Sequence, residues 1–296
     1  MTLPIVPHRS DIAPAGLTRV DKLLACIDPV VQSGLEIGAL CRPIVAPGTG
    51  PIRYADHMDT SGLREKYAND DTVDIDQIVD VSVVWGESTL PQAVGDARFD
   101  YVIASHVIEH VPDMVGWLHE VAAVLKPGGV LSLAIPDKRY TFDAGRALTT
   151  FSALIESFFL KRRRPSFRDV LDQHEWVVAV PELITSEAIW KGAGEPRSLP
   201  SRHPSLIEDL GVEGLRNYFD QIENGHYMDV HVQVLTPESF VAIFKRLADV
   251  GLLDFKIAAF YPTITNDMEF FVSLEKLPKD MDRAARRDAI RTSLPS

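Results

Sequence analysis

The chain has 296 residues, of which 46% are hydrophobic and 24% charged. This balance is typical of a globular protein and excludes a disordered or fibrous chain. Its 30 Lys and Arg residues against 42 Asp and Glu residues give a net charge of -12, which argues against nucleic acid as the main partner. Two cysteines without metal-type spacing, no secretory signal and no long apolar stretch lead us to expect a protein of the reducing cytoplasm without a transmembrane segment.

Strands alternate with helices over the first half of the sequence. Short apolar runs predict five strands, at residues 34–38, 51–56, 79–85, 99–105 and 130–135. Helices are expected before or between them, at residues 21–27, 61–67 and 114–125. We take Ser61 as the cap of the second helix. This alternation calls for right-handed crossovers and a mostly parallel sheet.

The rhythm changes after the fifth strand. Residues 138–234 are too long for an ordinary connection, so we expect an inserted cap with helices of its own, at 147–160, 174–180 and 206–218. A helix follows from Pro237, with Thr236 as its N-cap, and a closing pair of strands is expected at 255–261 and 269–275.

These elements predict an α/β fold with a Rossmann-like, mostly parallel sheet, an antiparallel last strand and an inserted helical cap. The predicted division has three parts: a cofactor domain of residues 1–137 and 235–278, a substrate cap of residues 138–234 and a flexible tail of residues 279–296.

Polar residues stand at four of the predicted strand ends, where an open α/β sheet binds nucleotide-like ligands. Glu36 suits a ligand ammonium or the ordering of a loop, and Gly38 lets the backbone approach a ligand. Asp56 is placed to accept both hydroxyls of a ribose, and Glu87 to reach an adenine edge. Ser105 ends the fourth strand.

In order and spacing, these pieces resemble class I S-adenosylmethionine-dependent methyltransferases, in the branch with an Ile-Glu-His-Val turn after the fourth strand. The matching pieces are Glu36-x-Gly38, Asp56, Gly86-Glu87-x-x-Leu90-Pro91, Phe99-Asp100, Ile108-Glu109-His110-Val111 and Leu125-Lys126-Pro127-Gly128-Gly129. The resemblance covers residues 34–136, the final helix and the last strands. It implies a methyltransferase that uses S-adenosylmethionine as its cofactor.

By the same resemblance, Gly38 faces the methionine portion of the cofactor, Asp56 its ribose and Glu87 its adenine side. Ser105 and His106 lie at the rim near the reactive methyl group. The first loop departs from the family, because Gly38 is followed by Ala39-Leu40 where three alternating glycines are common. A non-catalytic cofactor-binding protein therefore stays open as an alternative.

His106, Glu109 and His110 would share one face of a helix. Three interpretations compete: packing of the turn, a general base for a substrate hydroxyl, and a divalent metal site. Some relatives with Glu-x-x-Glu-His bind magnesium here, but His106 replaces the hard oxygen ligand that magnesium prefers. Our predicted catalytic residues are His106 and His110, and no metal is assigned.

The acceptor is predicted from the insertion. Candidate substrate-binding residues are Asp137, Lys138, Arg139, Tyr140, His174 and His231. Their mixed charges suit a polar, hydroxyl-rich acceptor. The runs at residues 135–140 and 228–231 also resemble bacterial methyltransferases of surface-polysaccharide modification. This resemblance implies O-methylation of a sugar or polysaccharide-type acceptor, with a natural-product small molecule as the second choice. A dinucleotide oxidoreductase would need a glycine-rich loop and a Tyr-Lys pair, which the expected places lack.

A basic run, Lys161-Arg162-Arg163-Arg164, is the one local exception to the acidic charge balance. Such a run suits a phosphate or a peripheral membrane contact, but it is more often a solvated helix end. We favour the solvated helix end. The sequence makes no prediction of an oligomeric state.

Overall fold

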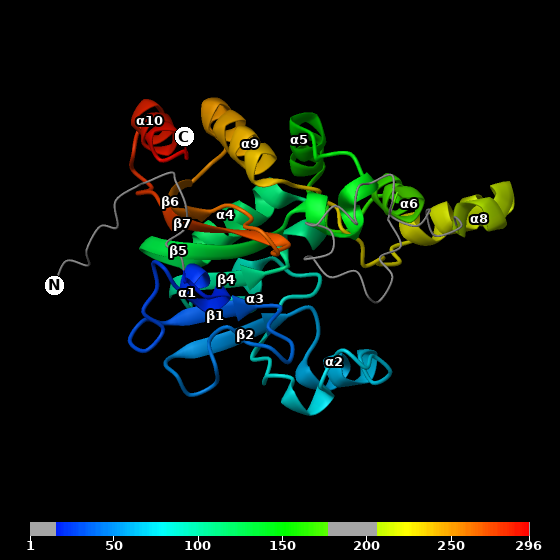
Figure 1. Cartoon of the computed structure of the whole chain (residues 1–296), viewed down its shortest axis with the longest axis horizontal. Helices are drawn as coiled ribbons and strands as arrows, with labels where there is room; N and C mark the ends of the chain where they lie inside the picture. Colours follow the sequence, from blue (N-terminus) through cyan, green and yellow to red (C-terminus); the bar gives the residue numbers. More distant parts are fainter. Residues whose placement is uncertain (1–15, 177–205, 296) are drawn as a thin grey trace.

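A computed structural model describes residues 16–176 and 206–295 (Figure 1). Its centre is a seven-stranded sheet of order β3-β2-β1-β4-β5-β7-β6. The strands are β1 (Gly34–Ile37), β2 (Ile52–Asp56), β3 (Val83–Val84), β4 (Phe99–Ser105), β5 (Leu125–Pro136), β6 (Phe255–Tyr261) and β7 (Glu269–Lys276). Strands β1 to β5 pair in parallel, and β7 runs antiparallel to both β5 and β6. The predicted α/β class is confirmed.

The sheet is covered on both faces, because side chains alternate across each strand. In β4, Val102 and Ala104 belong to the larger apolar cluster, whereas Tyr101 and Ile103 belong to a smaller one. The larger cluster includes residues of α3 (Leu90–Val94), α4 (Met114–Val124), α9 (Pro237–Val250) and α10 (Arg283–Thr292). The smaller cluster includes Leu23 of α1 (Arg19–Leu23).

Helix α9 begins as its sequence predicts. Thr236 and Ser239 form a reciprocal capping box, and Pro237 occupies the first turn. The predicted cap of α2 (Thr60–Lys66) is wrong, because the Asp59 carboxylate and not Ser61 accepts the Gly62 N–H, at 2.8 Å. A carboxylate at this position serves the same capping purpose.

Two predicted segment boundaries also change. Strand β3 has only two residues, since the segment before it includes a short 3-10 helix, η1 (Ile75–Gln77), and irregular backbone. The expected flexible tail is wrong for residues 283–292, which form α10. This helix buries Ile290 against the core, and Ser293 beyond it accepts a hydrogen bond from the Ile257 N–H of β6.

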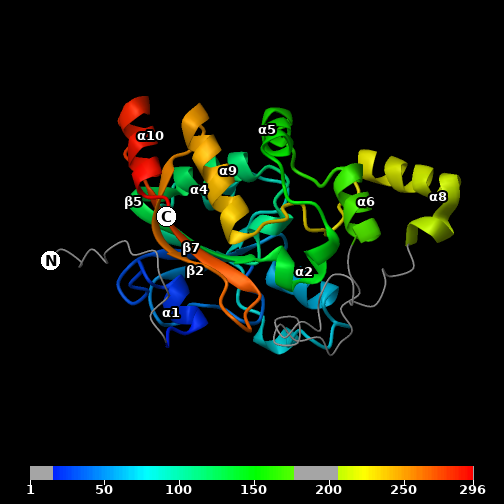
Figure 2. The same cartoon turned by 45° about the horizontal axis from the view of Figure 1, so that its top comes forward.

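The insertion has its own helices, as expected. They are α5 (Phe151–Leu160), α6 (Phe167–Trp176) and α8 (Leu206–Glu223), preceded by the 3-10 helices η3 (Lys138–Tyr140) and η4 (Phe142–Gly145). The helix expected at 174–180 instead begins at Phe167, and residues 177–180 lie outside the described part of the chain. Figures 1 and 2 show α6 and α8 together at one side of the molecule, away from the sheet.

The strand register brings three strand ends to one level. Ile37 of β1 pairs with Ala55 of β2 and with Ala104 of β4. The residues that follow these partners, including Asp56 and Ser105, therefore lie along one carboxyl edge of the sheet. Within the described residues, no helix is both long and apolar enough to cross a membrane.

Candidate cofactor and acceptor site

Glu36 is buried at the end of β1 and serves the loop that follows. Its carboxylate oxygens accept hydrogen bonds from the backbone N–H groups of Ile44 and Val45, at 2.7 and 3.0 Å. Burial raises the pKa of Glu36 to about 7, against the opposing effect of these two hydrogen bonds. Glu36 was predicted either to bind a ligand ammonium or to order a loop. These contacts are those of a residue that orders the loop.

Gly38 opens this loop in a conformation that requires glycine. Its φ is +72°, and a Cβ atom there would lie 3.0 Å from Cγ2 of Val107. The Gly38 N–H donates to the Ala55 carbonyl at 2.9 Å, which continues the β1–β2 pairing beyond the strand. The backbone at Gly38 is thus held at the carboxyl edge of the sheet without a side chain in the way.

Asp56 ends β2 with a largely buried carboxylate. Its Oδ1 accepts the His57 backbone N–H at 2.7 Å and lies 2.6 Å from Nδ1 of the same histidine. Both contacts use one oxygen. The predicted role of Asp56 at a ribose stays a prediction.

Glu87 follows β3 and is 72% exposed. It pairs with Arg164 of the insertion at 2.9 Å, and the neighbouring Arg163 pairs with Glu120 at 2.6 Å and donates to the Ser88 carbonyl. Two of the four residues of the basic run therefore bind within the chain. These contacts connect the insertion to the loop that follows β3, on the predicted adenine side.

The end of β4 is joined to α1 and β7. Ser105 Oγ accepts a hydrogen bond from Arg19 Nη2 at 2.5 Å, and Arg19 Nε donates to Glu269 at 2.7 Å. The same Glu269 lies 2.7 Å from Nε2 of His106, whose φ is +54°. Burial opposes protonation of His106, but the Glu269 hydrogen bond and the Glu109 charge together raise its pKa.

Glu109 and His110 lie in the 3-10 helix η2 (Ile108–His110). The Glu109 side chain is 2% exposed, and neither carboxylate oxygen has a hydrogen-bond partner among the described residues. Its nearest cation is His106, whose Nδ1 lies 3.6 Å away. His110 Nδ1 lies 3.0 Å from Asp229 in an ion pair without hydrogen-bond alignment.

His231 reaches this turn from the end of the insertion. Its ring meets the His110 ring edge-on at 4.7 Å, and its Nδ1 lies 2.6 Å from the buried carboxylate of Asp143. The backbone N–H groups of residues 232 and 233 both donate to the Glu109 carbonyl, which fixes the two segments together. Glu109, His110 and His231 each offer a ligand atom within 4.8 Å of the others, so this group has the composition of a metal site.

The remaining predicted substrate residues do not gather at this turn. Asp137 is 0% exposed, and its carboxylate accepts hydrogen bonds from Arg139 and Thr263. Lys138 donates to the Arg146 carbonyl, and the Arg139 guanidinium lies 5.5 Å from the Tyr140 ring.

His174 lies farther along the insertion, in α6. Its ring packs edge-on against Tyr218 at 6.1 Å, and burial lowers its pKa. It stands in the small apolar layer between α6 and α8. His231 is thus the predicted substrate residue whose ring packs against that of His110.

Several residues of the site were missed in the sequence. Arg19 and Glu269 meet across 250 positions, and Asp143 meets His231 across 88. Asp229, two residues before His231 in the sequence, pairs with His110. No spacing within one segment signals such contacts, because each partner lies on a different element.

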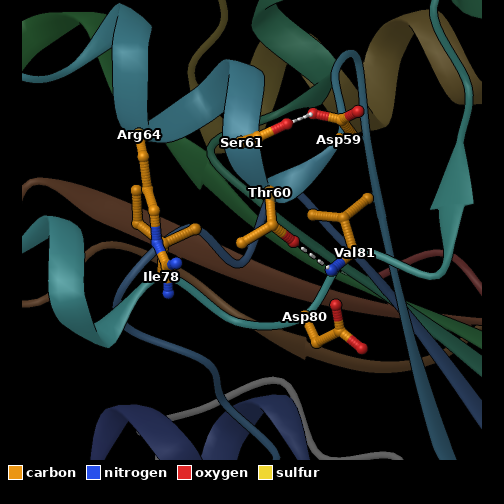
Figure 3. Close-up of a pocket in the computed structure, with 7 residues that line it drawn as sticks. All are labelled: Asp59, Thr60, Ser61, Arg64, Ile78, Asp80 and Val81. Atoms are coloured by element: carbon orange, nitrogen blue, oxygen red, sulfur yellow. Dashed lines mark hydrogen bonds between the residues drawn. The ribbon is translucent and has the colours of Figure 1, made fainter.

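A separate surface pocket of about 700 Å³ lies beside the start of α2 (Figure 3). Within it, Thr60 Oγ1 accepts the Val81 N–H at 2.9 Å and Ser61 donates to Asp59 at 2.7 Å. Its lining residues are Asp59, Thr60, Ser61, Arg64, Ile78, Asp80 and Val81. None of them is a predicted site residue.

Comparison with known proteins identifies the family. The family model described as a methyltransferase domain matches residues 36–247. A ubiquinone biosynthesis O-methyltransferase of Rhodopseudomonas palustris (strain BisB18) is 28% identical over 132 residues, which cover 44% of this chain and 49% of the relative. The chain thus spans about half the length of the curated relatives it matches.

The solved structures that match are less similar in sequence than the curated relative. A possible histamine N-methyltransferase from Thermotoga maritima is 13% identical, with a TM-score of 0.39 over 87% of this chain and 86% of that one. A putative Zn-dependent alcohol dehydrogenase from Rhodobacter sphaeroides is 12% identical, with a TM-score of 0.46 over 88% and 89%. The family match, which covers most of the chain, decides the assignment.

The chain belongs to the methyltransferase-domain family. Its cofactor is S-adenosylmethionine.

Proposed function

We propose that this methyltransferase O-methylates a hydroxyl group of a sugar or polysaccharide-type acceptor. The observation that carries the proposal is the row of strand-end residues, Gly38, Asp56 and Ser105, beside the imidazoles of His106 and His110. A cofactor along this row presents its sulfonium methyl to the imidazoles. The polar insertion that supplies His231 supports a hydroxyl-rich acceptor.

Transfer is direct. S-adenosylmethionine, when bound, would supply its methyl group to the acceptor oxygen as the carbon–sulfur bond breaks, and S-adenosylhomocysteine would leave as a neutral thioether. The enzyme contributes chiefly by holding the oxygen and the methyl carbon in near-attack geometry. The hydroxyl proton passes to an imidazole, which suits this role near neutral pH.

The two imidazoles are supported differently. His106 is held between two carboxylates, with Glu269 at 2.7 Å and Glu109 at 3.6 Å. His110 has Asp229 at 3.0 Å and the His231 ring against its edge. Both arrangements stabilise an imidazolium after proton transfer, so each residue is a candidate proton acceptor.

A small aromatic or natural-product hydroxyl is the second candidate acceptor. The observation in its favour is the similarity to ubiquinone biosynthesis O-methyltransferases, which methylate oxygen. Aromatic rings also border the turn, since the Phe142 ring lies 4.7 Å from that of His231. A non-catalytic cofactor-binding protein is the remaining alternative, on the grounds of the Ala39-Leu40 departure.

Alanine variants test the imidazole mechanism. His106→Ala and His110→Ala should leave the dissociation constant for S-adenosylmethionine within about threefold of wild type, because neither imidazole is needed to hold the cofactor. At least one of them should lower S-adenosylhomocysteine release by roughly 100-fold or more. Full turnover in both variants would remove the mechanism.

An acceptor screen tests the substrate class. Oligosaccharides and substituted phenols are offered to the wild-type protein with S-adenosylmethionine, and S-adenosylhomocysteine is measured. Release with saccharides supports the first candidate, and release with phenols alone replaces it with the second. Absence of release with any cellular extract favours the non-catalytic alternative.

A further inference from the structure

The turn after β4 contains a buried carboxylate that has no hydrogen-bond partner among the described residues. Glu109 is 2% exposed, and both of its oxygens lack hydrogen bonds within the described residues. A buried carboxylate in this state is costly unless something pairs with it. The nearest cationic group, His106 Nδ1 at 3.6 Å, is too far for a hydrogen bond.

Two imidazoles surround the same carboxylate. A ligand atom of Glu109, one of His110 and one of His231 all lie within 4.8 Å of one another. Ligands bound at 2.0–2.1 Å to one tetrahedral ion would stand roughly 3.3 Å apart. Small side-chain rotations therefore suffice to bring the three ligand atoms to the separation that one ion requires.

Each imidazole also has a carboxylate near its Nδ1 atom. His231 Nδ1 lies 2.6 Å from Asp143, and His110 Nδ1 lies 3.0 Å from Asp229. His231 uses its second ring nitrogen as metal-binding histidines characteristically do, which fixes the ring and increases the basicity of the ligating nitrogen, whereas the His110 pair lacks hydrogen-bond alignment. Arg146 in turn holds Asp143 at 2.8 Å.

The ligand set indicates the kind of ion. Two imidazoles and one carboxylate suit zinc and similar first-row ions, whereas magnesium prefers oxygen ligands alone. The His110 side chain is 33% exposed, so the group opens on one side. Three protein ligands with an open position are the arrangement of a catalytic rather than a structural zinc site.

We propose that Glu109, His110 and His231 bind one divalent zinc-type ion, which departs from our sequence-based expectation of no metal. The acceptor hydroxyl occupies the open position, where the ion lowers its pKa. His110 is then a ligand, and His106 is the group that receives the hydroxyl proton. This last step rests on the proposed O-methyl transfer, whereas binding of the ion does not.

The test uses the full-length protein after removal of metal with a chelator. Calorimetric titration with Zn²⁺ should give one ion per chain, and Mg²⁺ should give no saturable binding under the same conditions. Glu109→Gln and His231→Gln should each weaken Zn²⁺ binding by at least about 100-fold, and Asp143→Asn by roughly 10-fold or more. The matched control is His119→Gln, because His119 lies outside the group and contacts the Leu252 carbonyl; it should bind Zn²⁺ like wild type.

Three results would overturn the Zn²⁺ site. Absence of Zn²⁺ binding by the wild-type protein, or equal binding by Glu109→Gln and wild type, would overturn it. If a variant does not fold, Co²⁺ added to the wild type decides, since coordination by two imidazoles must produce visible d–d absorption and its absence overturns the site. S-adenosylmethionine titrated into the same samples separates this result from the proposed function, because cofactor binding does not need the ion.

Discussion

Glu36 makes the fold sensitive to pH. Its pKa in the folded protein is raised to about 7, compared with an ordinary value of 4.5. The folded state therefore holds a proton that the unfolded state loses between these two values. Stability from this group is complete below the lower value and is lost as pH rises towards 7, by up to roughly 3 kcal/mol.

We expect Glu36→Gln to remove this part of the pH dependence, since glutamine keeps the size and one carbonyl oxygen without titrating. The measurement is the free energy of unfolding in urea at pH 5 and pH 7.5 for both proteins. Wild type should lose more stability than the variant over this interval. Parallel pH profiles would show that Glu36 is ionised in the folded protein.

Replacement of Asp56 tests the predicted cofactor site through a single side chain. We expect Asp56→Ala to raise the dissociation constant for S-adenosylmethionine by roughly 10- to 100-fold, the loss of one or two hydrogen bonds to a charged group. Calorimetry measures this, with the exposed Asp288→Ala as the control. An unchanged dissociation constant for Asp56→Ala would place the ribose elsewhere.

At the residue scale, strand-end positions were predictable and cross-chain partners were not. Glu36, Gly38 and Asp56 are identifiable because each directly follows or ends a short apolar run. Arg19 and Glu269 are charged residues without a local pattern, and only the packing of α1 over β7 brings them together. Binding of the cofactor by these residues remains a prediction.

At the element scale, α10 carries a prediction of its own. Ile290 is 1% exposed in a helix whose other residues are charged, alanine or threonine. Ile290→Ala should lower the free energy of unfolding by about 2–4 kcal/mol, through lost burial and the cavity left behind. Urea denaturation checks this, with exposed Arg287→Ala as the control. Arg287 pairs with its neighbour Asp288, and its variant is expected within about 0.5 kcal/mol of wild type.

A loss in the free energy of unfolding for Ile290→Ala as small as that of the control would mean that α10 is not docked on the core.

The tail was mispredicted because its charged composition was weighed above its pattern of spaced apolar residues. Helix α9 was predicted correctly for the opposite reason. Its N-terminal signals, Thr236 and Pro237, act within one turn and need no tertiary context.

At the scale of the whole molecule, the alternation of strands and helices was sufficient to predict the class of sheet. Right-handed crossovers leave few arrangements for five parallel strands, and the closing strands were visible as apolar runs. The placement of the insertion was beyond prediction. Its return segment, which carries His231, is fixed by backbone hydrogen bonds to Glu109, and no sequence pattern announces such bonds.

We infer that the carboxyl edge of this sheet binds S-adenosylmethionine and not a dinucleotide. Isothermal titration of the full-length protein with S-adenosylmethionine, and separately with NAD, tests it most directly. We predict saturable binding of one S-adenosylmethionine per chain and no saturable binding of NAD. Binding of NAD without binding of S-adenosylmethionine would contradict the account.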